Sequence, residues 1–75
     1  MVIAKFTVTN IQPSTHIPEG FSITLMPVVQ GSPENEEFYK STPAGQITLE
    51  TVNKEAVDKF ELHSSYYVHF TKAME

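Results

Sequence analysis

A chain of 75 residues that is 40% hydrophobic is long enough for one small domain, which we expect to span residues 1–75. Its lack of cysteine excludes disulfides and thiolate zinc sites, and its net charge of −4, with five lysines and no arginine, disfavours binding to nucleic-acid phosphates. No segment approaches the roughly 20 apolar residues that cross a bilayer, and the N-terminus lacks signal-peptide features, so we expect a soluble, intracellular protein.

The first 29 residues predict two strands separated by a loop. Val2–Thr9 alternates, with its even-numbered apolar residues on one face. Asn10–Gly20 contains two prolines and a glycine, which predicts a long and mobile loop. Phe21–Val29 alternates again, and Pro27, which has no N–H to donate, predicts that this strand bulges or lies at a sheet edge.

A first helix and a third strand follow. Ser32 and Pro33 are suited to the N-cap and first position of a helix whose early glutamates lie near the positive end of its dipole. Thr42–Gly45 ends this helix. Gln46–Val52 then alternates as a strand, with Ile47 and Leu49 expected on the core side.

The last third of the chain predicts a second helix and a closing strand. Asn53 is a suitable N-cap for a helix of about two turns, with Ala56, Val57 and Phe60 as its apolar stripe. Tyr66–Thr71 then alternates as an aromatic strand.

Four strands and two short helices predict a mainly β, small α+β domain. We expect a four-stranded, mostly antiparallel sheet or partial barrel, for which OB-like and SH3-like barrels are the nearest familiar shapes. We expect the helices to cover one face of this sheet, which leaves its other face and its edges available for contacts.

No catalytic, cofactor-binding or metal-binding residues are expected. His16, His63 and His69 do not lie at the spacing of a helix-borne metal site. The chain has neither a Gly-x-Ser-x-Gly elbow nor a glycine-rich phosphate loop. A chain this small also has little room for a pocket of a few hundred Å³. We therefore expect a protein that is not an enzyme and has no small-molecule substrate.

Adjacent aromatic residues predict a surface for another macromolecule. Tyr66 and Tyr67 follow each other on a strand, so that one of them points away from the core. Rim packing, a protein contact and a stacking platform for single-stranded nucleic acid are the three alternatives, and the last is disfavoured because a cationic groove is missing. The residues expected to contact a partner protein are Tyr39, Tyr67, His69 and, in the Pro13–Pro18 loop, His16 and Ile17.

Several short motifs match one known group of proteins. They are Lys5-Phe6-Thr7, Pro27-Val28, Gly31-Ser32-Pro33-Glu34-Asn35 with Phe38, Thr42-Pro43-Ala44-Gly45-Gln46-Ile47-Thr48-Leu49, Ala56 with Phe60, and Tyr66-Tyr67-Val68-His69-Phe70-Thr71. In these motifs the chain resembles small uncharacterised proteins of tailed bacteriophages and prophages. It departs from them at His69, where the group usually has aspartate, and at His63, where it usually has glycine.

The resemblance implies a phage origin and supplies no catalytic residue. Together with the small, acidic, β-rich composition, it leads us to expect a non-enzymatic phage accessory protein that binds another protein, most concretely a capsid-decorating or virion-associated subunit. The alternatives are an OB-like single-stranded nucleic-acid-binding protein of phage replication or recombination, and an inhibitor of a host defence enzyme. The expected partner is a capsid protein, a host protein or a second copy, met in the host cytoplasm during infection or in the virion, with no membrane involved.

Overall fold

The computed structural model describes residues 2–29, 31–41 and 45–74, which form four strands and two short helices. In chain order the elements are β1 (Val2–Pro13), β2 (Phe21–Pro27), α1 (Pro33–Ser41), β3 (Ile47–Thr51), α2 (Lys54–Asp58) and β4 (Ser65–Phe70). All strand pairs are antiparallel, in the order β3-β2-β1-β4. The predicted small, mainly β α+β fold is confirmed as a curled, four-stranded half-barrel.

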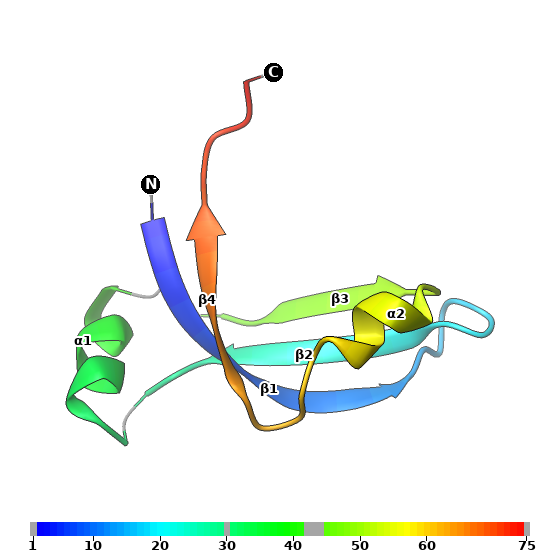
Figure 1. Ribbon diagram of the computed structural model, residues 1–75, viewed down its shortest axis with the longest axis horizontal. Helices are drawn as coiled ribbons and strands as arrows, with labels where there is room; N and C mark the ends of the chain where they lie inside the picture. Colours follow the sequence, from blue (N-terminus) through cyan, green and yellow to red (C-terminus); the bar gives the residue numbers. More distant parts are fainter. Residues whose placement is uncertain (1, 30, 42–44, 75) are drawn as a thin grey trace.

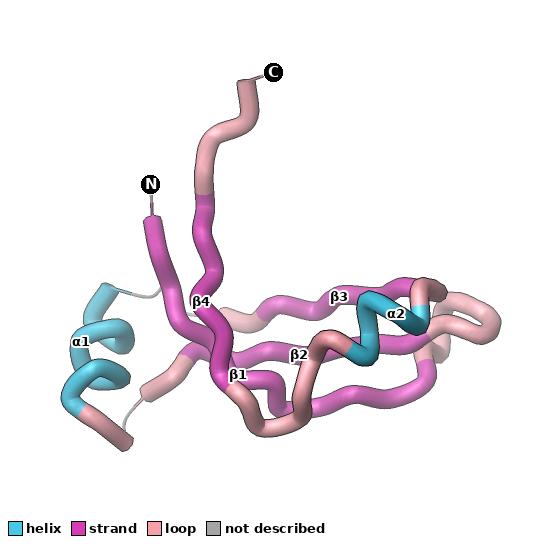
Figure 2. The backbone as a smooth tube through the Cα atoms, viewed as in Figure 1, coloured by secondary structure: helices cyan, strands magenta, loops and turns pink. Residues whose placement is uncertain are grey.

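The long first strand organises the sheet, because it pairs with β2 along one side and with β4 along the other. Figure 1 shows β1 curving through the molecule, with β4 beside its N-terminal part and β2 beside its C-terminal part. Figure 2 shows that the segment after β4 leaves the body of the molecule. Because the strand order is β3-β2-β1-β4, the two outer strands of the half-barrel are β3 and β4.

The prediction that Asn10–Gly20 is a loop is wrong for its first four residues. Pairing between β1 and β2 passes a bulge between Val8 and Asn10 and then continues to Pro13, opposite Phe21. The bulge lets the strand bend and continue rather than end. The remaining loop is short, and the Ser14 N–H closes it by donating to the Gly20 carbonyl at 2.9 Å.

The position of Pro27 also differs from the prediction, since β2 is an inner strand and the bulge lies in β1. Pro27 is the last residue of β2, and it lies beyond the final β2–β3 pair, Leu25 with Ile47. A proline at this end of the strand removes no hydrogen bond from the ladder with β3.

One face of the sheet, here called the core face, carries the buried apolar side chains. The buried cluster consists of Ala4, Phe6, Val8, Ile23, Leu25 and Val57. Val57 belongs to α2, which packs over this face. Asn53 caps α2 as predicted, because its side chain accepts hydrogen bonds from the backbone N–H groups of Glu55 and Ala56 at 3.0 and 3.3 Å. Burying this face is the main source of stability in so small a domain.

The two helices do not cover the same face, which corrects the prediction. Ser32 accepts a hydrogen bond from the backbone N–H of Asn35 at 3.0 Å, as expected of the N-cap of α1. From there α1 reaches Lys5 and Tyr67, which point away from the core face because side chains alternate along a strand. We call this opposite side the outer face. The structure thus splits its two helices between the faces (Figure 1).

Candidate functional site

An open apolar cleft of about 520 Å³ lies on the core face between the two outer strands. It is lined by Leu25 of β2, Ile47 and Leu49 of β3, Phe60 after α2, and Tyr66, Tyr67, Val68, His69 and Phe70 of β4. The curl of the sheet brings β3 and β4 to opposite sides of this space. The cleft is therefore the unfilled mouth of the half-barrel.

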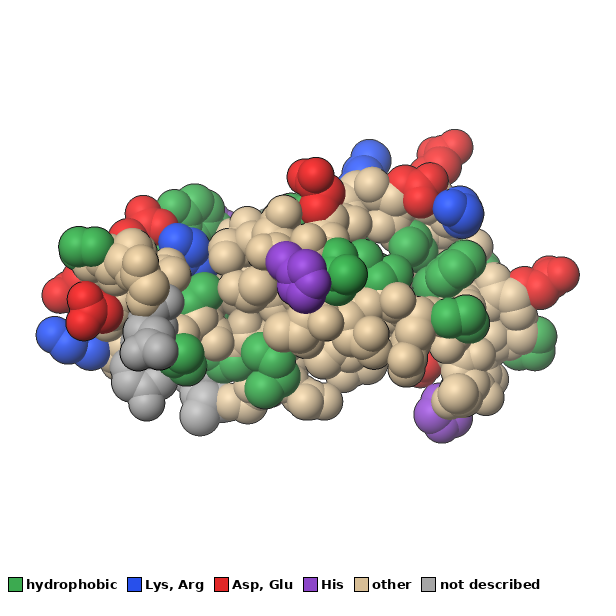
Figure 3. All heavy atoms as spheres, turned by 90° about the horizontal axis from the view of Figure 1, so that it is seen from below, with side chains coloured by type: hydrophobic (Ala, Val, Ile, Leu, Met, Phe, Trp, Pro, Cys, Tyr) green, Lys and Arg blue, Asp and Glu red, His purple; other side chains and the backbone are tan. Residues whose placement is uncertain are grey.

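Leu49 and Phe70 leave large parts of their side chains exposed at the cleft, 43% and 48% respectively. Leu49 pairs with buried Ile23 in the ladder and so belongs to the core face, as predicted, but it is not buried there. Figure 3 shows hydrophobic side chains reaching one face of the molecule in several patches, with most charged groups toward its two ends. Exposed apolar side chains that share a concave surface mark a docking site more often than scattered ones do.

The polar groups that line the cleft have other roles. The Tyr66 hydroxyl accepts a hydrogen bond from the Glu61 N–H at 2.9 Å and donates one to the Lys59 carbonyl at 3.2 Å. The ring of Tyr66 packs on Phe60 with centroids 5.6 Å apart. The side chains of Tyr67 and His69 belong to the outer face by strand alternation. The cleft therefore offers shape and apolar surface rather than a set of acids and bases.

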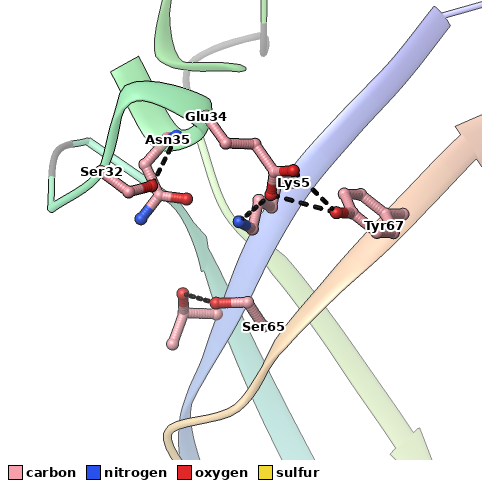
Figure 4. Close-up of polar contacts among 7 residues, drawn as sticks. Lys5, Ser32, Glu34, Asn35, Ser65 and Tyr67 are labelled. Carbon is pink, nitrogen blue, oxygen red and sulfur yellow. Dashed lines mark hydrogen bonds and ion pairs between the residues drawn. The ribbon is translucent and has the colours of Figure 1, made fainter. Parts of the chain in front are cut away.

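A second cluster lies on the outer face, where α1 meets β1 and β4 (Figure 4). Lys5 forms an ion pair with Glu34, and the Tyr67 hydroxyl donates to the two oxygens of the same carboxylate at 3.0 and 3.1 Å. The hydrogen bond from Lys5, followed by that from Tyr67, lowers the pKa of Glu34 below its ordinary value. The ring of Tyr67 lies 5.5 Å from that of Phe38. This cluster fixes α1 to the sheet.

The five residues expected to contact a partner do not form one surface. Tyr67 and His69 share the outer face of β4, and Tyr67 remains 55% exposed beside Phe38. His16 and Ile17 lie in the β1–β2 loop, at the opposite end of the molecule from α1 (Figure 1). Tyr39 belongs to α1, and its side chain lies outside the described part of the structure.

The β1–β2 loop is held by its own contacts. The Ser14 hydroxyl accepts from the backbone N–H groups of His16 and Ile17 at 3.1 and 3.0 Å, and it donates to Glu50 of β3 at 2.7 Å. A side chain at Gly20 would come within 2.8 Å of Ile17, so that Ile17 packs against a position that needs glycine. This loop is therefore ordered by its own hydrogen bonds.

Metal-ligating groups do not gather in the described residues. Within residues 2–29, 31–41 and 45–74, no three His, Asp or Glu side chains are placed to hold one metal ion. His16 lies near Glu50, with 3.7 Å between Nδ1 and the carboxylate, while His63 lies in the turn before β4 and His69 on β4 itself. In this same part of the chain, neither helix has the length and apolar character that crossing a membrane requires.

Sequence reasoning missed the cleft because it expected little room for a pocket in so small a chain and because the alternating pattern placed Leu49 on the core side. The pattern does show which face a side chain joins, but not whether anything covers that face. The feature that indicates an uncovered part of the core face is the shortness of α2, since five residues are too few to cover a four-stranded sheet.

Comparisons with protein-family models, with curated proteins and with solved structures found no match. The assignment of a site therefore rests on the geometry of this chain alone.

Proposed function

We propose that this protein is a non-enzymatic binding protein that docks a segment of another protein in the cleft between β3 and β4. The observation that carries the proposal is the exposure of Leu49 and Phe70 on a concave apolar surface that also includes buried Leu25 of the core. Burying such surface on a partner is favourable at about 25 cal/mol per Å² of apolar area removed from water. An apolar strand or the apolar face of a helix suits this cleft.

The concrete version is a phage accessory protein that attaches to the virion. It is supported by the resemblance to small tailed-phage proteins and by the lack of convergent catalytic groups in the cleft. A small domain of this kind gains stability when it docks, because a ligand that binds only the folded state shifts the folding equilibrium. Repeated copies on a capsid would add up through multivalency.

Two exposed apolar residues that lie three positions apart in the sequence allow a matched test. Leu49 lines the cleft, whereas Val52, just after β3, is 63% exposed and is not part of the cleft lining. We expect particles purified from the encoding phage to contain the wild-type protein and Val52→Lys, with Leu49→Lys reduced at least tenfold. Quantitative mass spectrometry of the particles measures this ratio.

Absence of the wild-type protein from particles would end the virion version. In that case, affinity capture from infected cells with the same three proteins tests the cleft itself. Equal recovery of one partner by Leu49→Lys and by the wild-type protein would show that the cleft is not the docking site.

Binding to single-stranded nucleic acid is less well supported. Three of the five lysines are paired with acids: Lys5 with Glu34, Lys40 with Glu37 and Lys54 with Asp58. A non-specific binder needs a cationic groove beside its stacking residues. A filter-binding titration would detect such a binder by a steep loss of affinity as salt is raised.

A further inference from the structure

The outer edge of β4 can be mapped from two backbone hydrogen bonds. The Val8 N–H donates to the Ser64 carbonyl at 3.0 Å, on the β4 side of β1. The Lys5 carbonyl accepts from the Val28 N–H at 3.1 Å, on the β2 side. Because backbone groups alternate in an antiparallel ladder, even-numbered residues of β1 before the bulge bond to β4 and odd-numbered residues there bond to β2.

The same alternation fixes which residues of β4 face outward. Even-numbered residues of β4 lie opposite even-numbered residues of β1 and use their N–H and C=O groups in that ladder. Ser65, Tyr67 and His69 therefore direct their N–H and C=O groups away from the sheet. Among the described strands, none lies beyond β4 to form hydrogen bonds with these groups.

This edge lacks the features that protect most edge strands. The sequence of β4, Ser-Tyr-Tyr-Val-His-Phe, contains no Lys, Arg, Asp or Glu, no proline and no glycine. Natural edge strands are usually blocked by lysine, proline, bulges or a covering segment. By contrast, the other edge strand, β3, carries Glu50 within its five residues. Four of the six residues of β4, two tyrosines, a valine and a phenylalanine, are of the aromatic and β-branched types that favour strand pairing.

We propose that β4 pairs antiparallel with β4 of a second copy, joining two half-barrels into one continuous eight-stranded sheet. A two-fold axis through this edge matches each outward N–H with an outward C=O, since the same strand supplies both sides. It also places residues of the same face opposite each other; with the axis at Val68, for example, exposed Phe70 lies opposite the partner's Tyr66.

A second copy fits this edge better than an arbitrary charged strand. Because β4 contains no Lys, Arg, Asp or Glu, self-pairing places none of these side chains opposite a like charge, although the chain as a whole carries −4. Like charges directly opposite would weaken the pairing. Cross-strand aromatic and valine pairs add to the backbone bonds. The inference goes beyond the proposed function, because it concerns the backbone edge of β4; the two surfaces share Phe70, whereas Leu49 lies on the other edge strand, β3.

Two substitutions at one residue separate the backbone from the side chain. His69→Pro removes an outward N–H, and the rule that proline is tolerated where the N–H faces solvent predicts that the β1–β4 ladder survives. His69→Ala removes the imidazole but keeps this N–H. In every two-fold register in which the partner strand reaches position 69, the backbone N–H of His69 in each copy donates one hydrogen bond to the other copy. We therefore expect His69→Pro to raise the dimer dissociation constant at least about tenfold, and His69→Ala to change it by less than about threefold.

Sedimentation equilibrium over a range of protein concentrations measures these constants. Circular dichroism confirms that each variant is folded. A wild-type protein that stays monomeric up to about 1 mM would overturn the proposal. Equal dimerisation of the wild-type protein and folded His69→Pro, or equal loss in both variants, would overturn it as well.

Amide exchange of the wild-type protein provides a test that does not depend on the proline variant folding. The outward amides of Tyr67 and His69 should exchange more slowly as protein concentration rises, while the amides of exposed β3 residues should not change. Concentration-independent exchange at both positions would contradict the pairing. Leu49→Lys should leave the dimer intact, so that failure of the cleft and failure of the edge remain distinguishable.

Discussion

The core face has a closed part and an open part, although the same kinds of residue build both. Ile23 and Leu49 lie directly opposite each other in the β2–β3 ladder, yet Ile23 is 1% exposed and Leu49 is 43% exposed. The difference comes from what lies over them, since inner strands and α2 surround Ile23 while Leu49 lies on an outer strand beside the cleft. Coverage, and not residue type, separates the core of this protein from its candidate binding surface.

Truncating both members of this pair should give the largest difference. Ile23→Ala should lower the free energy of unfolding by about 3 kcal/mol, because it leaves a cavity among close-packed side chains. Leu49→Ala should lower it by less than about 1 kcal/mol, because much of the side chain is already in water. Urea denaturation followed by circular dichroism measures both values.

The outcome also bears on whether the cleft is open in solution. If Leu49→Ala cost as much as Ile23→Ala at a concentration where the protein is monomeric, the cleft would be closed and the contrast between the two parts would fail. A cost for Leu49→Ala that appears only at high concentration would instead indicate that another copy covers this residue.

Neighbouring tyrosines extend the comparison to the two faces of β4. Tyr66 lies on the core face, and its hydroxyl bonds two backbone groups of the turn before the strand. Tyr66→Phe leaves the Glu61 N–H and the Lys59 carbonyl without this partner and should cost about 1 kcal/mol. Tyr67→Phe should cost less, because its hydroxyl bonds an exposed carboxylate on the outer face. Each variant lacks one hydroxyl oxygen relative to the wild-type protein, and thermal unfolding checks which loss costs more stability. A larger cost for Tyr67→Phe would mean that the hydroxyl on the outer face, and not the one on the core face, contributes more to stability.

The turn that leads into β4 offers a smaller change in the opposite direction. His63 has φ of 70°, a left-handed conformation that is unfavourable for a residue with a side chain. Its N–H donates to the Val8 carbonyl at 2.8 Å, which holds this conformation in place. His63→Gly should raise the free energy of unfolding by about 0.5 kcal/mol, after the greater chain entropy of glycine is counted.

The control for this change is His63→Ala, which removes the imidazole but keeps a Cβ in the same conformation. We expect no gain from it in the same chemical denaturation experiment. A similar gain from alanine and glycine would mean that the imidazole, rather than the backbone, is unfavourable here.

Local signals predicted most of the fold, and long-range packing explains what they missed. Asn53 and Ser32 cap the two helices as expected, because capping depends on residues next to each other in the chain. Asn10 looked like the start of a loop, but pairing with β2 continues past it across a bulge. The split of the helices between two faces depends on contacts such as Glu34 with Lys5, which are remote in sequence.

The candidate site was harder to predict than the fold. Tyr67 was correctly placed outside the core, but its role in holding α1 depends on Glu34 and Phe38, which no local pattern connects to it. His16 and Ile17 were grouped with it from composition alone, and the structure places them at the other end of the molecule. The cleft follows from the curl of the sheet and the shortness of α2. Neither property can be read from hydrophobic alternation.

The outer-face cluster should give the smallest effect, visible as a pH dependence. The pKa of Glu34 lies below its ordinary value of 4.5, because Lys5 and Tyr67 hydrogen-bond the carboxylate in the folded state. A lowered folded-state pKa stabilises the protein above 4.5, and this contribution is lost as pH falls through the folded-state value. Glu34→Gln has no carboxylate to protonate at this position. As pH falls from 5.5 through the folded-state pKa of Glu34, the stability of this variant should therefore fall less than that of the wild-type protein. Glu55→Gln, at an exposed site of α2, is the matched control. Since the carboxylate is solvent-exposed, screening keeps the difference small, and added salt should reduce it further. Parallel pH profiles for wild-type and Glu34→Gln would mean that α1 is attached to the sheet through Phe38 and Tyr67 packing rather than through this carboxylate.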